Sequence, residues 1–368
     1  MMWSAAFWLV ALVVCTAPFV PALCEWLAGT DAEPLMVVRE QDTNIRHFAL
    51  SFFDQIQNFF EREGIDPLAP PADYEGEFRP GQGFLLLGPD SRPQWSDEIR
   101  RTRLVNTLLI GCGDLMIEGG YVYEQEIYCG GQLYGGANST FRAVYAGTDL
   151  VLGQNCTVAR WLHSQGHVHI DRDCTVYGRI SSTSSITLAP GTRFQRLNAE
   201  VVRFASDAAV AGGLGMQRPA SIAWTVPRHA RQLDERTVSC EGDLKLFTAT
   251  RVDTHLVTRG SLDVGTSCEM NGNLKAGEAL VLGAGCVVRG ALVCPGPITI
   301  GPGCLVKGPV VSESSISIAA GSVIGTPGLA TTVTAPRIRV ESGCQVSGTL
   351  WATAEGVVDA PPKRGSRV

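Results

Sequence analysis

An 18-residue repeat occupies much of this sequence and constrains its fold more than any other feature. Repeats of a fixed length in this range are typical of solenoids, in which each repeat forms one structural unit. The segments in register begin at Asp243, Ser261, Ala279, Pro297 and Ser315, and the same phase recurs at Asp149, His167 and Ser185, with fainter copies at Asp114 and Arg337.

The pattern inside one repeat predicts short strands and tight corners. Repeat positions 2 and 4 are aliphatic, as at Leu262 and Val264, which is the alternation of a strand with one buried face. Position 12 is glycine in several copies, where the chain turns from one strand into the next. These glycines are Gly178, Gly272, Gly290 and Gly308. Three strands and three corners make one triangular coil.

A single coil cannot bury its inward side chains, so the coils must stack at about 4.8 Å per rung. The sequence therefore predicts an all-β fold, a parallel β-helix in two blocks, 106–204 and 241–356. Residues 205–240 break the period, and we interpret them as a lateral insertion or a linker between the blocks, of which the insertion is favoured. Residues 357–368 are expected to form a disordered tail.

The N-terminus predicts a membrane anchor. No charged side chain precedes Glu25, and Trp3–Leu23 is a largely apolar run of 21 residues. A helix of this length is about 31 Å long, which matches the hydrocarbon core of a bilayer. A cleavable signal peptide would begin with a basic region, and none is present. We therefore expect residues 1–26 to be a retained transmembrane anchor that contacts the bilayer through residues 3–23.

Residues 42–64 predict an amphipathic helix, with Asp42 or Thr43 as N-cap, because apolar side chains recur at helical spacing. Its apolar face carries Phe48, Phe52, Phe53, Phe59 and Phe60. This face has three candidate contacts: the bilayer, a helix of a partner protein, or the end of the domain that follows. Residues 65–105 are rich in turn-forming residues and are interpreted as a linker.

The charge, cysteine and histidine content limits which partners, cellular compartment and kinds of site are expected. With 30 basic and 36 acidic residues, the formal net charge is −6, which argues against a nucleic-acid partner. Cysteine recurs at repeat position 8, and stacked thiols of this kind favour a reducing compartment and a cytoplasmic solenoid. The position-8 residues are Cys156, Cys174, Cys268, Cys286, Cys304 and Cys344. His163, His167 and His169 are interpreted as a solvated strand face, so no metal, cofactor or catalytic residue is predicted.

The coils VLGAGCVVRGALV, ITIGPGCLVKGPVV and VHIDRDCTVYGRI resemble the bactofilin family of polymer-forming bacterial cytoskeletal proteins. The resemblance implies a β-helix that assembles end to end into nonpolar filaments without nucleotide. It also implies a position beneath the bacterial membrane and a role as scaffold for envelope or morphogenetic proteins. The chain departs from the family in its longer repeat region and in the size of the segment that interrupts it.

We therefore expect a single-pass inner-membrane scaffold, not an enzyme, whose partners are further copies of itself and an envelope or morphogenetic protein. Self-association would use unpaired strand edges at the terminal coils. These are expected at Leu115 and Ile117 at one end and at Ile338, Val340 and Leu350 at the other. Two alternatives stay open: a left-handed hexapeptide acyltransferase, with His163 as the nearest general base, and an exported carbohydrate-binding or adhesive solenoid.

Overall fold

In the computed structural model the chain divides into two compact units, Met1–Asn44 and Ile45–Val368. The described residues are 44–67, 73–89, 91–205, 222–226 and 230–359, together with Thr16 and Val20. Apart from those two residues, the predicted anchor at Trp3–Leu23 lies outside this set. Among the residues described, no helix is both long and apolar enough to cross a membrane.

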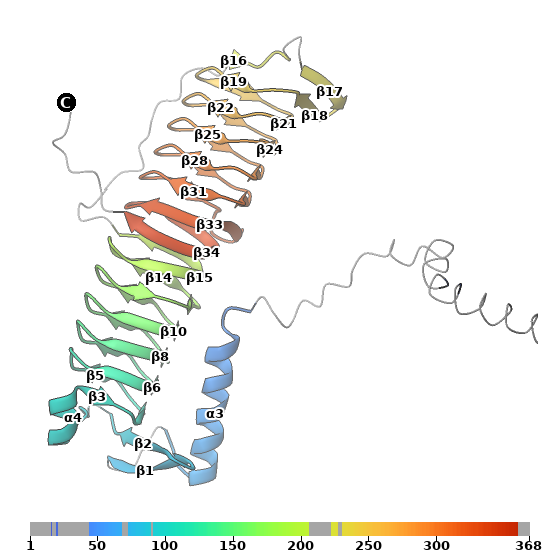
Figure 1. The fold of residues 1–368 in the computed structure, drawn as a ribbon. Helices are drawn as coiled ribbons and strands as arrows, with labels where there is room; N and C mark the ends of the chain where they lie inside the picture. The colour runs from blue at the N-terminus through green and yellow to red at the C-terminus, as the bar shows by residue number, and fades with distance from the viewer. Residues whose placement is uncertain are drawn as a thin grey trace, which may run out of the picture. The chain divides into compact units, whose positions relative to one another are not determined.

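The second unit is a parallel β-solenoid of about 13 turns, which confirms the predicted parallel β-helix (Figure 1). The repeat length equals one turn: Leu262, Leu280 and Ile298 are in-register partners on successive rungs. Each rung contributes short strands to columns of parallel strands, so the stacking predicted from the period is the observed one.

Two helices are described in this unit, α3 (His47–Glu63) and α4 (Asp97–Thr102). The strands up to the end of the first block are β1 (Tyr74–Arg79), β2 (Gln82–Leu87), β3 (Leu104–Val105), β4 (Leu108–Gly111), β5 (Leu115–Ile117), β6 (Val122–Cys129), β7 (Leu133–Gly135), β8 (Thr140–Ala146), β9 (Leu150–Leu152), β10 (Thr157–Ser164), β11 (Val168–Ile170), β12 (Thr175–Val176), β13 (Arg179–Ser182), β14 (Ser185–Leu188) and β15 (Arg193–Phe204).

The strands of the second block are β16 (Ile222–Ala223), β17 (Ala230–Asp234), β18 (Thr237–Cys240), β19 (Leu244–Leu246), β20 (Thr250–Val252), β21 (His255–Thr258), β22 (Leu262–Val264), β23 (Glu269–Met270), β24 (Leu274–Lys275), β25 (Leu280–Leu282), β26 (Val287–Val288), β27 (Leu292–Cys294), β28 (Ile298–Ile300), β29 (Leu305–Val306), β30 (Val310–Ser312), β31 (Ser315–Ile318), β32 (Val323–Ile324), β33 (Thr331–Glu341) and β34 (Gln345–Asp359).

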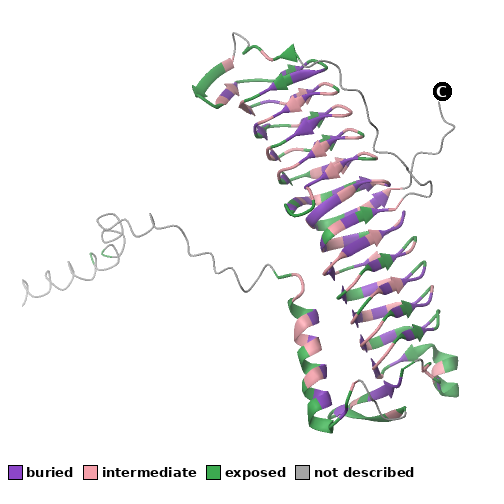
Figure 2. Ribbon diagram, turned by 180° about the vertical axis from the view of Figure 1, so that it is seen from behind, coloured by how far each residue is buried: buried purple, intermediate pink, exposed green. Residues whose placement is uncertain are grey.

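The solenoid core follows from the strand alternation (Figure 2). Leu262 and Val264 are buried, and Asp263 between them points outward, where it pairs with Lys245 of the previous rung at 3.1 Å. Close stacking explains the corner glycines: a Cβ at position 178 would lie 1.6 Å from the carbonyl oxygen of Arg160 on the rung below. At that corner, only a residue without a side chain allows the two rungs to pack.

The two blocks join in a way that the period does not predict. The last strand of the first block, β15, pairs antiparallel with β34, the last strand of the second block (Figure 1). The earliest strands of the second block, β16, β18 and β19, form parallel pairs only with later strands of that block. The blocks therefore meet at their C-terminal coils, and the second block runs back toward the first.

This arrangement corrects the interpretation of residues 205–240 as a lateral insertion. β18 already belongs to the first coil of the second block, since Thr237 is the register partner of His255. Ala205 follows β15 at the junction, whereas Ile222 begins β16 in the coil of the second block furthest from that junction.

Two other predicted boundaries are also corrected. Residues 65–105 are not simply a linker, because β1 and β2 form an antiparallel hairpin and β2 pairs in parallel with β4. The solenoid therefore begins at β2. The expected tail also starts later, because β34 continues to Asp359. The 18-residue period does not reveal the last coils, because their turns differ in length. Val310, for example, pairs with Val333, a step of 23 residues instead of 18.

The amphipathic helix is confirmed over His47–Glu63, as α3. Its N-cap is Arg46, whereas the expected caps Asp42 and Thr43 lie outside the described residues. It ends at Gly64, whose φ of 64° is the left-handed C-cap conformation that glycine adopts readily. The helix lies along the flank of the first block, next to β8 and β10.

Candidate functional site

The phenylalanine face of α3 packs on the chain's own solenoid. Phe52 lies 5.6 Å from Trp161 between ring centroids, and Phe53 stacks on Tyr145 at 5.2 Å. Phe60 contacts Tyr128 edge-on at 5.9 Å. The outward aromatic residues of β6, β8 and β10 are therefore covered by the helix.

The two ends of this face differ in exposure. Phe59 is buried against the β1–β2 hairpin, where its ring centroid lies 5.0 Å from those of both Phe78 and Phe84. Phe48 is 51% exposed and carries the guanidinium of Arg179 at 4.7 Å from its ring centroid. Of the three contacts considered for this face, the observed one is docking on the following domain, on its flank and not on its end. A bilayer or partner surface is not available at the buried positions.

The buried histidine of the predicted cluster lies under the same helix. His163 is the register partner of Tyr145, and its Nδ1 lies 2.8 Å from Ser181 Oγ. Its Nε2 has no hydrogen-bond partner among the described residues. Burial disfavours the imidazolium ion and lowers the pKa of His163 to about 4, with a smaller contribution from Arg46. His163 is therefore neutral at neutral pH.

The other two histidines are exposed, as predicted for a solvated strand face. His169 lies in β11, and His167 directly precedes that strand. Within the described ranges, no group of three or more histidine, cysteine or acidic side chains is placed to hold a metal ion. His163 does not belong to that exposed face, because α3 covers it. This covered flank was not predicted; the sequence signal that could have indicated it is the aromatic residues Tyr128, Tyr145 and Trp161 at outward positions of neighbouring strands.

The residues expected at the C-terminal end of the solenoid lie in its middle. Ile338 pairs with both Ile316 and Gly356, and Val340 is held in the same way between β31 and β34. Leu350 pairs with Leu197 across the antiparallel junction. Because these side chains are fully buried between rungs, the prediction of a free strand edge at this point is corrected.

At the junction, side chains of β15 and β34 form complementary contacts. The carboxylate of Glu355 forms an ion pair with Arg193 at 3.0 Å, and Asn198 Nδ2 donates to Thr349 Oγ1 at 2.9 Å. Arg196 lies over the ring of Trp351 at 4.3 Å from its centroid. Two β-helix ends of this chain are therefore able to seal against each other through an antiparallel ladder and complementary side chains.

At the N-terminal end, Leu115 and Ile117 lie in β5, which forms the first rung of its column. Both side chains are buried. The segment that follows β2 lies beside them: a Cβ at position 113 would lie 2.9 Å from the Cα of Pro89. Trp95 continues this cover and contacts Tyr121 at 5.9 Å between centroids. Leu115 and Ile117 are therefore covered by the chain itself, although Met116 between them is 49% exposed.

The outermost strand at this end, β1, has one edge without a partner strand among the described residues. That edge strand exposes Glu75, Glu77 and Arg79. Charged side chains on an edge strand oppose the addition of a further strand. β1 is therefore protected against a further strand, whereas β3 and β5 at the same end each keep one edge without a partner strand among the described residues.

The opposite end of the solenoid is more open. Within the described residues, β19 pairs only with β22, so its other edge has no partner strand. Large apolar side chains are exposed around it, with Phe247 at 79% and Ile222 at 68%. A cavity of about 340 Å³ lies between Trp224, Lys245 and Phe247. We call this region, β16–β19 and Phe247, the far end.

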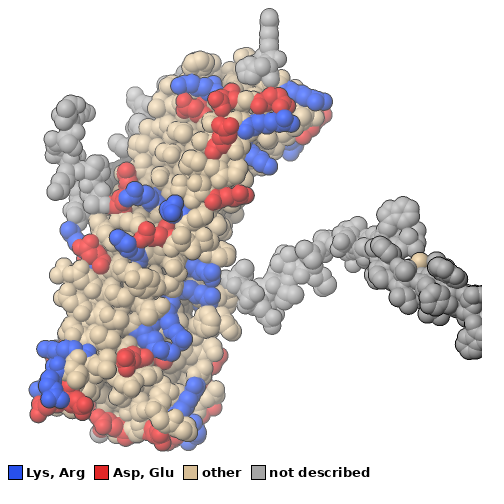
Figure 3. All heavy atoms as spheres, in the orientation of Figure 1, with Lys and Arg blue, Asp and Glu red and all other residues tan. Residues whose placement is uncertain are grey.

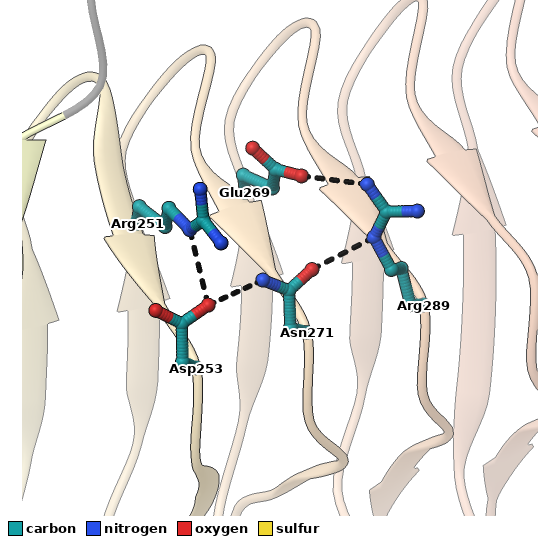
Figure 4. Close-up of polar contacts among 5 residues, drawn as sticks. All are labelled: Arg251, Asp253, Glu269, Asn271 and Arg289. Carbon is teal, nitrogen blue, oxygen red and sulfur yellow. Dashed lines mark hydrogen bonds and ion pairs between the residues drawn. The ribbon is translucent and has the colours of Figure 1, made fainter.

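A polar ladder covers one face of the second block near the far end (Figure 4). Asp253 accepts hydrogen bonds from Arg251 Nε at 3.0 Å and from the amide of Asn271. Arg289 bridges Asn271 and Glu269, each at 2.7 Å. The hydrogen bond to Asp253 raises the pKa of Arg251. These hydrogen bonds join successive rungs to one another. The two arginines and two carboxylates of the ladder balance in charge.

The position-8 cysteines form buried columns. In the second block, the thiols of Cys268, Cys286 and Cys304 donate to main-chain carbonyls of earlier rungs at 3.0–3.1 Å. Burial raises the pKa of Cys344 to about 12. Ten cysteines are described, and each is a free thiol. They act as compact core residues, which agrees with their exchange for Thr192 and Ser322 in other coils.

No family model, curated protein or solved structure matches this chain.

Proposed function

We propose that the protein is a structural scaffold, similar to bactofilins in using a β-helix as the assembling element, and that two copies join through their far ends. The observation that carries the proposal is the inequality of the two ends. Among the described residues, each end has a short strand with one unpaired edge, β5 at the N-terminal end and β19 at the far end. The ends differ in apolar exposure, because Leu115 and Ile117 of β5 are buried, whereas Phe247 and Ile222 are exposed at the far end.

Physical reasons favour association at the far end. An unpaired strand edge presents free N–H and C=O groups that another strand satisfies, and exposed apolar side chains gain free energy when they are buried. The junction between β15 and β34 is a precedent within the chain, because it joins two solenoid ends through an antiparallel ladder. A second copy offers the same surface in the antiparallel orientation.

The burial of Leu115 and Ile117 at the N-terminal end limits how far assembly extends. A contact that uses the same surface on both copies closes after two copies and leaves no free site. We therefore infer a two-fold pair with the two N-terminal ends pointing outward, in place of the continuous filament that the bactofilin resemblance implies. In this proposal, residues 3–23 anchor each copy in the bacterial inner membrane, and the solenoid flanks face an envelope or morphogenetic partner in the cytoplasm.

The test is the mass of the full-length protein in solution, measured by light scattering and sedimentation in a mild detergent under reducing conditions and without nucleotide. We expect a dimer, and we expect Phe247→Asp to convert it to a monomer with an unchanged circular dichroism spectrum. Tyr177→Asp is the matched control, because Tyr177 is also exposed but lies in the first block. A wild-type monomer, or a dimer that survives Phe247→Asp, would overturn the proposal.

A further inference from the structure

A cleft between α3 and the flank of the first block has the features of a ligand site. Its volume is about 410 Å³, within the range of small-molecule pockets. The helix forms one wall, the β1–β2 hairpin forms the base, and β6, β8 and β10 form the other wall.

The charges in this cleft do not balance. Among the described residues that line it, three are arginines, Arg79, Arg142 and Arg160, and one is a carboxylate, Glu126. Glu126 Oε1 accepts from Arg142 Nε at 2.9 Å and lies 3.9 Å from Arg160 Nη1. The side chain of Arg160 is 58% exposed. Figure 3 shows basic side chains gathered beside α3.

This excess contrasts with the polar ladder of the second block, where arginines and carboxylates are equal in number (Figure 4). It also contrasts with the whole chain, whose formal net charge is −6. A local positive charge in an acidic protein focuses anions on the cleft. Guanidinium groups bind carboxylate and phosphate with paired hydrogen bonds, so the cleft suits a ligand that contains one of these groups.

The amides of the cleft indicate the rest of the ligand. Gln82 Nε2 donates to Gln125 Oε1 at 2.9 Å, and Gln125 Nε2 donates in turn to Asn106 Oδ1 at 2.8 Å. On the helix, Gln55 accepts from Arg79 at 2.6 Å. Each amide keeps further donor or acceptor capacity. A surface that mixes donors and acceptors in this way suits hydroxyl groups, which both donate and accept.

We propose that the cleft between α3 and the first block binds an anionic sugar, a sugar that carries a carboxylate or a phosphate group. Arg142 and Arg160 hold the anionic group, and Gln55, Gln82 and Gln125 bind the hydroxyl groups. Phe52 and Trp161 form the apolar floor beneath the ring, where they contact each other at 5.6 Å between centroids. This site is separate from the far end, so ligand binding does not require the assembly proposed above.

Titration calorimetry on the full-length protein tests the proposal with glucuronate and glucose 6-phosphate as the two anionic arms. We expect at least one of them to bind more tightly than glucose and than inorganic phosphate. Arg160→Gln is expected to weaken that binding about tenfold, because it removes charge-assisted hydrogen bonds. Glu126→Gln is expected to tighten it, because a competing carboxylate is lost. Arg259→Gln, an exposed arginine of the second block, is the control and leaves the affinity unchanged.

Four results would overturn the proposal: no binding of either anionic sugar, equal binding of glucose, equal binding of inorganic phosphate, or an affinity that Arg160→Gln leaves unchanged. Tighter binding of an acidic peptide or an oligonucleotide would assign the cleft to another class of ligand and would also refute it. Sedimentation of Arg160→Gln should match the wild type, so a failure here is distinguishable from a failure of the far-end proposal.

Discussion

The antiparallel junction can be tested by a double-mutant cycle between Phe194 and Gly356. The two residues are register partners on β15 and β34, and Phe194 is buried. A Cβ on residue 356 would lie 2.3 Å from the Phe194 ring, so glycine is required there by contact and not by a left-handed backbone. The cycle therefore reports directly on the interface between the two blocks.

The structure sets the expected free energies of unfolding. Phe194→Ala leaves a cavity and should destabilise the protein by about 3–5 kcal/mol. Gly356→Ala forces a methyl group into the ring and should cost about 1–3 kcal/mol. In the double variant, the methyl group introduced at position 356 enters the space that the ring has left, so its own cost disappears. We expect a coupling free energy of about 2 kcal/mol.

Urea unfolding of the full-length protein, followed by circular dichroism under reducing conditions, measures all four corners of the cycle. Gly242→Ala is the matched control, because no atom of the described residues lies within 4 Å of a Cβ there and its backbone is not left-handed. It should be neutral or slightly stabilising. If Gly356→Ala costs the same with and without the Phe194 ring, the two residues do not touch and the junction is misplaced.

Three further predictions follow from buried groups. Ile338→Asp places a carboxylate inside the stack and should lower the melting temperature sharply, so a soluble variant with an unchanged melting curve would contradict the burial of Ile338. Cys344, whose pKa burial raises to about 12, should resist maleimide at neutral pH and react in concentrated guanidinium chloride, as read by mass spectrometry. His163 has a pKa of about 4 in the fold against an ordinary value of 6.5, so the unfolded chain binds the proton first and stability falls as the pH drops from 6.5 toward 4. The loss should reach about 3 kcal/mol, and His163→Gln should flatten that part of the stability profile; an unchanged profile would refute the assignment.

The sequence alone determined the solenoid. Strand alternation at positions such as Leu262 and Val264 and the 18-residue step between rungs are local features, since each coil pairs with its neighbour along the chain. The same holds for α3, whose apolar stripe and terminal Gly64 define a helix without reference to its environment. The thiol columns were also visible, because residues one period apart stack directly above one another.

Tertiary structure alone decided which ends of the solenoid are free. Leu197 and Leu350 meet across the junction although they are far apart in the chain, and no period links them. Whether two terminal coils seal together depends on the fit of their side chains, such as Phe194 against Gly356, and this fit has no repeating signature. The position of α3 has the same origin: an amphipathic stripe shows that a helix packs on something, and only the aromatic flank formed by Tyr128, Tyr145 and Trp161 decides where.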